Sequence, residues 1–279
     1  MFRLFKNLLR ILILIIILGL AVILYARYIE PYMIKEKYYT IKSPFVTEKA
    51  ENLNIAVFGD THFGDYYNTE NFNKVIDSLE EKKPDIVVFT GDLIDYYDNY
   101  TGDIDEISKS LSKIEAPYGK YAIFGNHDYG GGAENEYQGI MESGGFTVLK
   151  NQYFAIDELG IAVIGIDDVI IGYGNPTIAS LGRPDYFNII LSHAPDVMDE
   201  VLNYNVDLML SGHTHGRQIN LKYFDEYILP PYGKNYVNGM YEFSNDRNSK
   251  LYVNSGLGTT KLPVRFLSPP ELTYITIVQ

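Results

Sequence analysis

The chain has 279 residues, of which 46% are hydrophobic and 21% charged, and this balance excludes an intrinsically disordered protein. Its net charge of −13 argues against a protein that holds many nucleic-acid phosphates, so we expect no nucleic-acid partner. The absence of cysteine excludes disulfides, thiol nucleophiles and cysteine-type zinc sites.

An apolar segment opens the chain. Arg3, Lys6 and Arg10 precede Ile11–Ala26, a run without charged or strongly polar side chains. With the two preceding leucines, and with the last arginine snorkelling, the run approaches the ~20 residues that span a bilayer. A core helix would have a polar face and a cleaved signal would end in small residues, and this segment has neither. We therefore expect residues 1–28 to form an uncleaved transmembrane anchor.

The charges around this segment bear on its orientation. The basic and then apolar order resembles an export signal, which favours a domain outside the cytoplasm. Arg27, Lys35, Lys37 and Lys42 lie beyond the apolar run and roughly balance the N-terminal basic residues. We expect the following domain to be extracytoplasmic.

Residues 29–44 are interpreted as a tether with prolines at both ends, and residues 45–279 as one folded domain. Continuous apolar runs in the first half of this domain predict buried strands at Leu53–Gly59, Asp85–Thr90 and Tyr121–Phe124. Between them, helical spacing predicts two amphipathic helices: one carries Phe72, Val75, Ile76 and Leu79, with Thr69 as its cap, and the other carries Ile104, Ile107, Leu111 and Ile114. This alternation predicts βαβ units with largely parallel strands.

The sequence of the second half of the domain predicts more strands and fewer helices than that of the first half. Strands are expected at Ile161–Ile166, Phe187–Leu191, 207–210, Leu251–Val253 and Leu272–Val278, with one short helix at Asp196–Asn203. Buried strands in both halves predict two sheets packed face to face with helices outside.

Polar residues follow these strands directly, where α/β sheets gather their ligands. The candidate metal ligands are Asp60, His62, Asp92, Asn126, His193, His213 and His215. Carboxylate, imidazole and amide donors together suit Mn, Fe or Zn better than Ca or Mg alone. Seven donors are too many for one tetrahedral site. A carboxylate shared by two ions ~3.5–4 Å apart gives the arrangement that activates water and clamps a phosphoryl group.

Three further residues are candidates for chemistry. His127 follows a ligand, and as an imidazolium it could stabilise developing charge and protonate a leaving alkoxide. The adjacent Asp128 could hold this ring or face solvent. Arg217 could touch a substrate phosphate or point to solvent. Asp95 is expected to orient its own turn.

The ordered blocks GDTH (59–62), GDLID (91–95), GNHD (125–128), SH (192–193) and GHTHG (212–216) resemble the calcineurin-like metallophosphoesterases. The resemblance implies a four-layer α/β/β/α sandwich of two mixed sheets. It also implies that Asp60, His62, Asp92 and His215 hold one metal and that Asp92, Asn126, His193 and His213 hold the other. In that arrangement Asp92 bridges the metals and His127 assists the leaving group.

The C-terminal region looks like a membrane-linked branch of this family, on the blocks NSGLG (254–258), LPVRF (262–266) and PPE (269–271). That branch includes broad phosphodiesterases and enzymes similar to the UDP-2,3-diacylglucosamine pyrophosphatases. One departure is Arg217, which stands where the branch commonly has the second glycine of GHTHGGQ.

The sequence therefore predicts a monomeric, membrane-anchored phosphoesterase with two divalent ions, manganese above iron or zinc. A metal-bridged hydroxide would cleave a phosphodiester or phosphomonoester, and the anchor makes a lipid-linked substrate reasonable. Two alternatives stay open. One is a nucleotide-sugar or lipid pyrophosphatase, and the other is a catalytically silent membrane-tethered binding module, although none of the seven ligands is missing.

Overall fold

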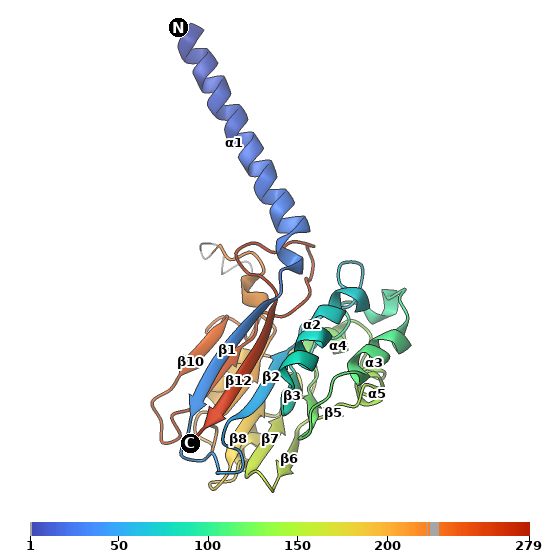
Figure 1. Ribbon diagram of the computed structural model, residues 1–279, viewed down its shortest axis with the longest axis vertical. Helices are drawn as coiled ribbons and strands as arrows, with labels where there is room; N and C mark the ends of the chain where they lie inside the picture. Colours follow the sequence, from blue (N-terminus) through green and yellow to red (C-terminus); the bar gives the residue numbers. More distant parts are fainter. Residues whose placement is uncertain (1, 222, 224–228) are drawn as a thin grey trace.

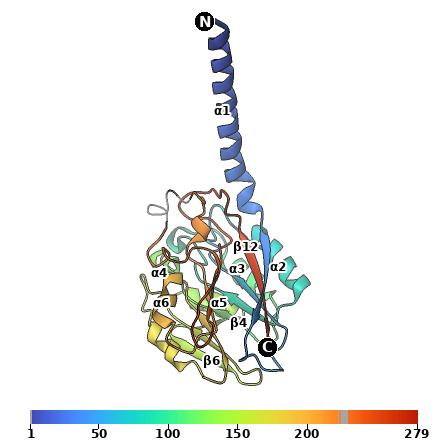
Figure 2. The same cartoon turned by 90° about the vertical axis from the view of Figure 1, so that its left-hand side faces the viewer.

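The computed structural model describes residues 2–221, 223 and 229–279. Two six-stranded sheets lie face to face, and helix α1 (Phe2–Tyr28) projects from one end of them (Figures 1 and 2). The short helix η1 (Glu30–Tyr32) joins α1 to the first sheet.

The first sheet has the strand order β1-β12-β2-β3-β4-β5. Its strands are β1 (Lys35–Lys42), β12 (Glu271–Val278), β2 (Leu53–Phe58), β3 (Ile86–Phe89), β4 (Lys120–Ala122) and β5 (Thr147–Val148). The β12–β2 pair is antiparallel and every other pair is parallel, so the sheet is mixed.

The second sheet has the order β10-β11-β9-β8-β7-β6. Its strands are β10 (Gly239–Glu242), β11 (Lys250–Val253), β9 (Leu208–Ser211), β8 (Phe187–Leu191), β7 (Ile161–Gly165) and β6 (Gln152–Ile156). The four central strands are parallel, and each edge strand is antiparallel to its neighbour.

Alternating side chains bury both faces of the central strands. In β2, Ile55 and Val57 pack between the sheets, whereas Ala56 and Phe58 pack against helices. The helices over the first sheet are α2 (Thr69–Lys82), α3 (Ile104–Ser112) and α5 (Tyr137–Ser143). The second sheet is covered by η3 (Pro176–Leu181), η4 (Pro195–Val197) and α6 (Met198–Val201). The expected four-layer α/β/β/α sandwich of two mixed sheets is confirmed.

Three other short helices, η2 (Tyr97–Asn99), α4 (Asn126–Gly130) and η5 (His215–Arg217), follow strand ends. Two boundaries differ from the predictions. The cap of α2 is Asn68 and not Thr69, since the Asn68 side chain accepts the Asn71 N–H at 3.0 Å. The segment expected to be a tether, 29–44, contains β1, which pairs with β12 along its whole length. The first sheet therefore begins at Lys35.

Helix α1 is, within the described residues, the one helix long and apolar enough to cross a membrane. Its most apolar stretch is wholly unburied, as expected for a helix outside the folded core. Its end is tied to the domain, because Arg265 N–H donates to the Ala26 carbonyl at 2.9 Å. Ser268 N–H also donates to the Glu30 carboxylate at 2.6 Å.

Strand direction fixes which end of the sandwich carries the site. The C-terminus, at the end of β12, lies at the end of the molecule opposite α1 (Figures 1 and 2). Because β2 runs antiparallel to β12, the carboxyl ends of β2, β3 and β4 point toward the α1 end. The loops that follow these strands therefore lie on the α1 side of the domain.

Candidate metal centre

Residues after the strand ends of both sheets converge at one place. Asp60 follows β2 and Asp92 follows β3 in the first sheet, whereas His193 follows β8 and His213 follows β9 in the second. The donors Asp60, His62, Asp92, His193, His213 and His215 are all buried. The candidate ligands are therefore gathered between the carboxyl ends of the two sheets, as the sequence predicted.

Sharp backbone turns direct these donors inward. Five of the seven candidate ligands have a positive φ, namely Asp60 (47°), His62 (44°), Asp92 (58°), His213 (74°) and His215 (51°). This left-handed region is uncommon for residues other than glycine and costs of order ~1 kcal/mol or more per residue. The surrounding packing must stabilise these conformations, so the site has a prearranged backbone.

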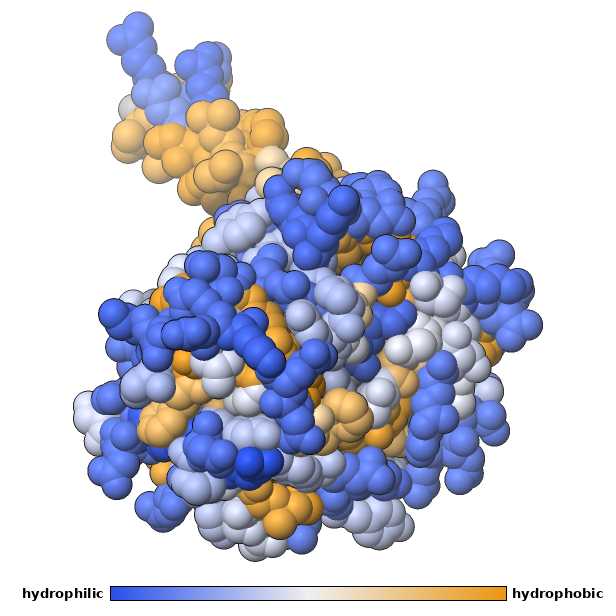
Figure 3. Space-filling model, turned by 60° about the horizontal axis from the view of Figure 1, so that its bottom comes forward, coloured by the Kyte–Doolittle hydropathy of each residue, from blue (hydrophilic) through white to orange (hydrophobic). Residues whose placement is uncertain are grey.

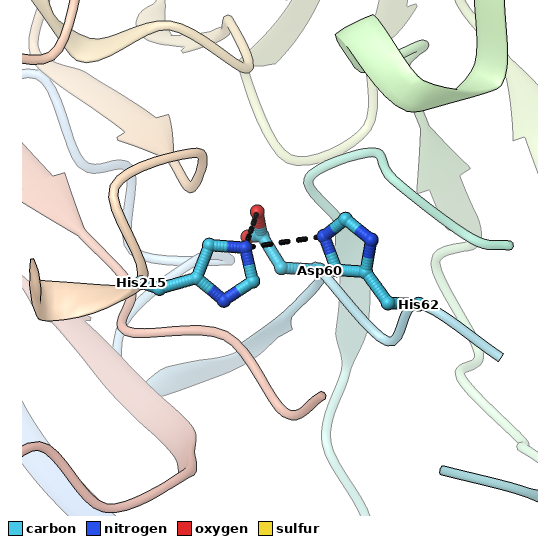
Figure 4. Close-up of side chains that lie close together, drawn as sticks. All are labelled: Asp60, His62 and His215. Carbon is cyan, nitrogen blue, oxygen red and sulfur yellow. Dashed lines mark hydrogen bonds and ion pairs between the residues drawn. The ribbon is translucent and has the colours of Figure 1, made fainter. Parts of the chain in front are cut away.

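The first group of donors consists of Asp60, His62 and His215 (Figure 4). The Nε2 atoms of His62 and His215 lie 3.1 Å apart, and His215 Nε2 lies 3.6 Å from Asp60 Oδ1. In Figure 4 the two rings and the carboxylate point toward one another, Asp60 and His62 from the loop after β2 and His215 from the loop after β9.

The second group consists of Asp92, His193 and His213. His193 Nε2 lies 3.2 Å from both Asp92 Oδ2 and His213 Nδ1. The amide oxygen of Asn126 is also 3.2 Å from His193 Nε2, so this predicted ligand joins the same group.

Asp92 lies between the two groups. Its Oδ2 atom is 3.2 Å from His193 Nε2 and 3.5 Å from His62 Nε2. Ligand atoms ~2.1 Å from a common ion are spaced ~3.0–3.4 Å apart, close to the separations found within each group. The nitrogen and oxygen donors suit transition metals. The residues therefore fit two divalent ions that share Asp92.

Outer partners determine which ring nitrogen can bind. A carbonyl only accepts, so His193 Nδ1 donates to Thr90 O at 2.7 Å and leaves Nε2 for a metal. His213 Nε2 donates to Pro231 O at 2.9 Å and leaves Nδ1. His62 Nδ1 lies 3.1 Å from Asp95 Oδ1. In each of these rings the nitrogen that faces its group is the one left free.

Burial and close charges shift the protonation of these groups. Burial raises the pKa of Asp60 to about 6, and it lowers the pKa of His213 to about 3 together with the nearby His193 charge. Burial also lowers the pKa of His215. Burial opposes protonation of His193 as well, but the Asp92 carboxylate outweighs it and raises that pKa to about 10. His213 and His215 are therefore neutral, the state that binds metal, whereas His193 would release its Nε2 proton when a metal binds there.

His127 lies beside this cluster and lines the adjoining pocket. Its Nδ1 donates to the Asp95 carbonyl at 2.9 Å and lies 3.2 Å from Asp95 Oδ1. Burial alone would lower its pKa, but Asp92 and Asp95 raise it to about 9. The ring is therefore an imidazolium near neutral pH and can donate a proton.

The structure corrects the expected role of Asp128. Its buried carboxylate accepts the backbone N–H groups of Asp92 (2.9 Å), Leu93 (2.9 Å) and Gly125 (2.8 Å). It braces two loops, and the residue that holds the His127 ring is Asp95. Adjacency in the sequence makes Asp128 a candidate to hold the His127 ring. The short helix α4 instead turns its carboxylate inward, toward backbone N–H groups, and the sequence pattern does not indicate this direction.

Two glycines allow the loops to approach this closely. A Cβ at Gly125 would lie 2.2 Å from Asp92 Oδ1, and one at Gly212 would lie 2.2 Å from Asp60 Oδ2. The two glycines belong to the blocks GNHD (125–128) and GHTHG (212–216). Any side chain at these positions would collide with a carboxylate of the site.

Arg265 is a residue of the site that the sequence did not reveal. It is fully buried, and its guanidinium donates to the carbonyls of Ser255, Gly256, Gly258 and Ser268. One guanidinium nitrogen also lies 3.5 Å from His215 Nδ1. The LPVRF block contained the residue, but nothing in the pattern indicated a buried arginine behind a ligand.

A pocket of about 550 Å³ opens beside the donors. Its floor includes Asp92, Asn126, His127, His213 and His215, and Arg217 and Lys261 also line it. Apolar side chains form much of the wall, namely Ile170, Ile219, Leu229, Pro230, Pro231 and Leu262. The pocket can hold a phosphate group beside His127, Arg217 and Lys261, with an apolar substituent against the apolar side chains.

Comparisons with known proteins identify the family of this chain. Residues 53–217 match the family described as calcineurin-like phosphoesterase. The chain is 42% identical over 267 residues to the uncharacterized metallophosphoesterase YkuE of Bacillus subtilis, covering 91% of this chain and 88% of that protein. An uncharacterized metallophosphoesterase of Aquifex aeolicus is 30% identical, with 90% and 94% covered. The phosphodiesterase YaeI of Escherichia coli is 29% identical, with 84% and 85% covered.

The chain belongs to the calcineurin-like phosphoesterase family and is a metal-dependent phosphoester hydrolase.

Proposed function

We propose that this phosphoesterase is a membrane-anchored, dinuclear-metal enzyme that hydrolyses phosphodiester bonds. The observation that carries the proposal is the convergence of seven donors into two groups that meet at Asp92. Paired divalent ions lower the pKa of water and neutralise phosphate oxygens, which is the chemistry that phosphoester hydrolysis needs. Manganese is the ion we favour, because the donors mix imidazole nitrogen with carboxylate and amide oxygen.

Each donor has an assigned place in this proposal. Asp60, His62 and His215 would hold one ion, and Asn126, His193 and His213 would hold the other. Asp92 would contribute to both sites. The buried Asp128 keeps the Asp92 loop against the Gly125 loop, so it positions the shared ligand without touching substrate.

His127 is the proposed general acid. Its raised pKa keeps the ring protonated, Asp95 fixes Nδ1, and Nε2 is left to protonate the leaving-group oxygen. Arg217 and Lys261 line the pocket and would pair with phosphate oxygens. The apolar wall leaves room for a second ester group, which favours a diester over a monoester.

The membrane part of the proposal rests on α1. The helix is long and apolar enough to span a bilayer, and the basic residues before its apolar run favour an extracytoplasmic domain. We propose a single-pass anchor, a monomeric chain and a phosphodiester substrate at the bilayer surface.

The test uses the full-length chain in detergent micelles and an aryl phosphodiester. Treatment with EDTA should abolish hydrolysis and Mn²⁺ should restore it. His213→Ala should bind less metal and hydrolyse the diester at least ~100-fold more slowly. The donor group of Asp92 and His193 loses one ligand in this variant, and a void replaces the ring. Full activity in this variant would overturn the proposal. Two bound ions without cleavage of the aryl diester would instead favour the pyrophosphatase, and absence of both metal and cleavage would favour the silent binding module.

A further inference from the structure

One segment joins the mouth of the pocket to the end of the anchor helix. Thr260, Lys261 and Leu262 line the pocket. A few residues later, Pro263 and Arg27 line one small cleft, and Arg265 N–H donates to the Ala26 carbonyl at 2.9 Å. One side of the pocket therefore lies near the point where α1 enters the domain.

This end of the domain carries exposed apolar side chains. We use the name membrane-proximal rim for Tyr28 (62% exposed), Ile29 (51%), Met33 (44%), Leu262 (57%) and Leu267 (59%). The face turned away from α1 is largely hydrophilic, with apolar residues scattered over it (Figure 3). Exposed apolar residues that continue directly from a candidate membrane helix indicate contact with lipid.

The residues around the rim have the composition of a membrane interface. The Arg27 guanidinium lies over the Tyr28 and Tyr66 rings, at 4.9 and 5.1 Å from their centroids. Tyrosine and arginine are frequent at the headgroup level of membranes. There the apolar part of the side chain contacts lipid while its polar group contacts water. Leu267 has a left-handed φ of 55° and an exposed side chain. Packing within the domain therefore does not explain why a leucine occupies this position.

The attachment of α1 fixes the rim relative to the bilayer. Besides the Arg265 contact, the buried Glu30 carboxylate accepts Ser268 N–H at 2.6 Å. The Ser268 hydroxyl donates to the carbonyls of His215 and Gly216 at 2.9 and 3.0 Å. A chain of hydrogen bonds thus runs from the end of α1 to the turn that carries a candidate metal ligand.

We infer that the membrane-proximal rim lies in the headgroup layer of the bilayer that α1 crosses, so that the pocket takes phosphodiesters of membrane lipids directly from that surface. The inference rests on the proposed function and specifies its substrate class. The pocket matches such a substrate, since candidate metal ligands, Arg217, Lys261 and several apolar side chains line it together.

The first test measures the environment of the rim with a fluorescent label. The chain has no cysteine, so Leu267→Cys can be labelled alone with the polarity-sensitive fluorophore NBD. The matched control is Leu181→Cys, because Leu181 is 50% exposed and precedes β8, at the opposite ends of the strands. Both full-length proteins are reconstituted into phosphatidylcholine–phosphatidylglycerol vesicles that contain lipids with quenching groups.

The label at position 267 should shift to shorter wavelength and be quenched severalfold more by these lipids than the label at position 181. Equal emission and quenching at the two positions would overturn the membrane contact, whatever the hydrolytic activity of the protein.

The second test addresses the substrate class with a competition assay. Hydrolysis of a soluble aryl phosphodiester is followed with phosphatidylglycerol in the vesicle, or with water-soluble glycerophosphoglycerol at the same bulk concentration. The lipid should inhibit at least tenfold more strongly. Leu267→Gln should leave hydrolysis of the aryl diester alone unchanged and weaken lipid inhibition severalfold.

Equal inhibition by the two compounds would overturn the lipid substrate while leaving the phosphoesterase intact. Absence of metal-dependent aryl diester hydrolysis in the wild-type protein would instead overturn the proposed function, independently of the fluorescence result.

Discussion

Asp95 is the residue whose replacement most sharply tests how the site is organised. Its carboxylate lies 3.1 Å from His62 Nδ1 and 3.2 Å from His127 Nδ1, so one side chain orients a candidate ligand and the proposed acid. Asp95→Asn keeps the shape and one accepting oxygen but removes the charge. Asp95→Ala removes both.

The expected magnitudes follow from the type of hydrogen bond that is lost. A bond to a charged group contributes ~1.5–3 kcal/mol and a neutral one ~0.5–1.5 kcal/mol. Asp95→Asn should therefore cost about 1.4 kcal/mol, which is a tenfold loss in kcat/KM. Asp95→Ala loses the whole interaction, worth roughly 3 kcal/mol, and should lower kcat/KM by on the order of 100-fold.

The assay is steady-state hydrolysis of the aryl phosphodiester with bound metal measured in parallel. Asp98→Asn serves as the control, since Asp98 is an exposed carboxylate nearby that has no contact with these histidines among the described residues. A kcat/KM for Asp95→Ala within twofold of the wild-type value, with metal retained, would refute the assignment of this residue.

Three further changes test the scaffold. Gly125→Ala should lose bound metal and hydrolytic activity, because the added Cβ would lie 2.2 Å from Asp92 Oδ1. The control Gly139→Ala places its Cβ in open space and should retain metal and activity. Metal analysis and hydrolysis rates distinguish the two variants. Arg265→Met leaves four carbonyls without their donor and should cost at least ~3 kcal/mol, seen as a fall in Tm of roughly 6–12 °C. A chain that starts at Lys42 lacks β1 and should give no cooperative thermal unfolding, whereas one that starts at Ile29 should unfold cooperatively.

The buried strands and the site blocks could be predicted because their signals are local. Strands such as β2, β3 and β8 are buried on both faces and appear as continuous apolar runs. The edge strand β1 has the sequence KEKYYTIK, in which exposed residues alternate with half-buried ones and only Ile41 is fully buried. Such a strand lacks the apolar run that would identify it, so the sequence predicts a tether for this segment.

The partners of the candidate ligands could not be predicted because they come from distant parts of the chain. Asp95 reaches His62 across 33 residues, and Arg265 reaches His215 across 50. Asp128, in contrast, is adjacent to His127 but points to backbone N–H groups. Spacing along the sequence identifies donors at strand ends, whereas the direction of a side chain depends on the turn that carries it.

Two divalent ions that share Asp92 between the two sheets would account for the arrangement of all seven donors. The most direct measurement is a crystal structure of the Mn²⁺-loaded protein with anomalous diffraction collected at the manganese edge. We expect two anomalous peaks, one beside Asp60 and His215 and one beside His193 and His213, with the Asp92 carboxylate between them. A single peak, or two peaks that do not share Asp92, would contradict it.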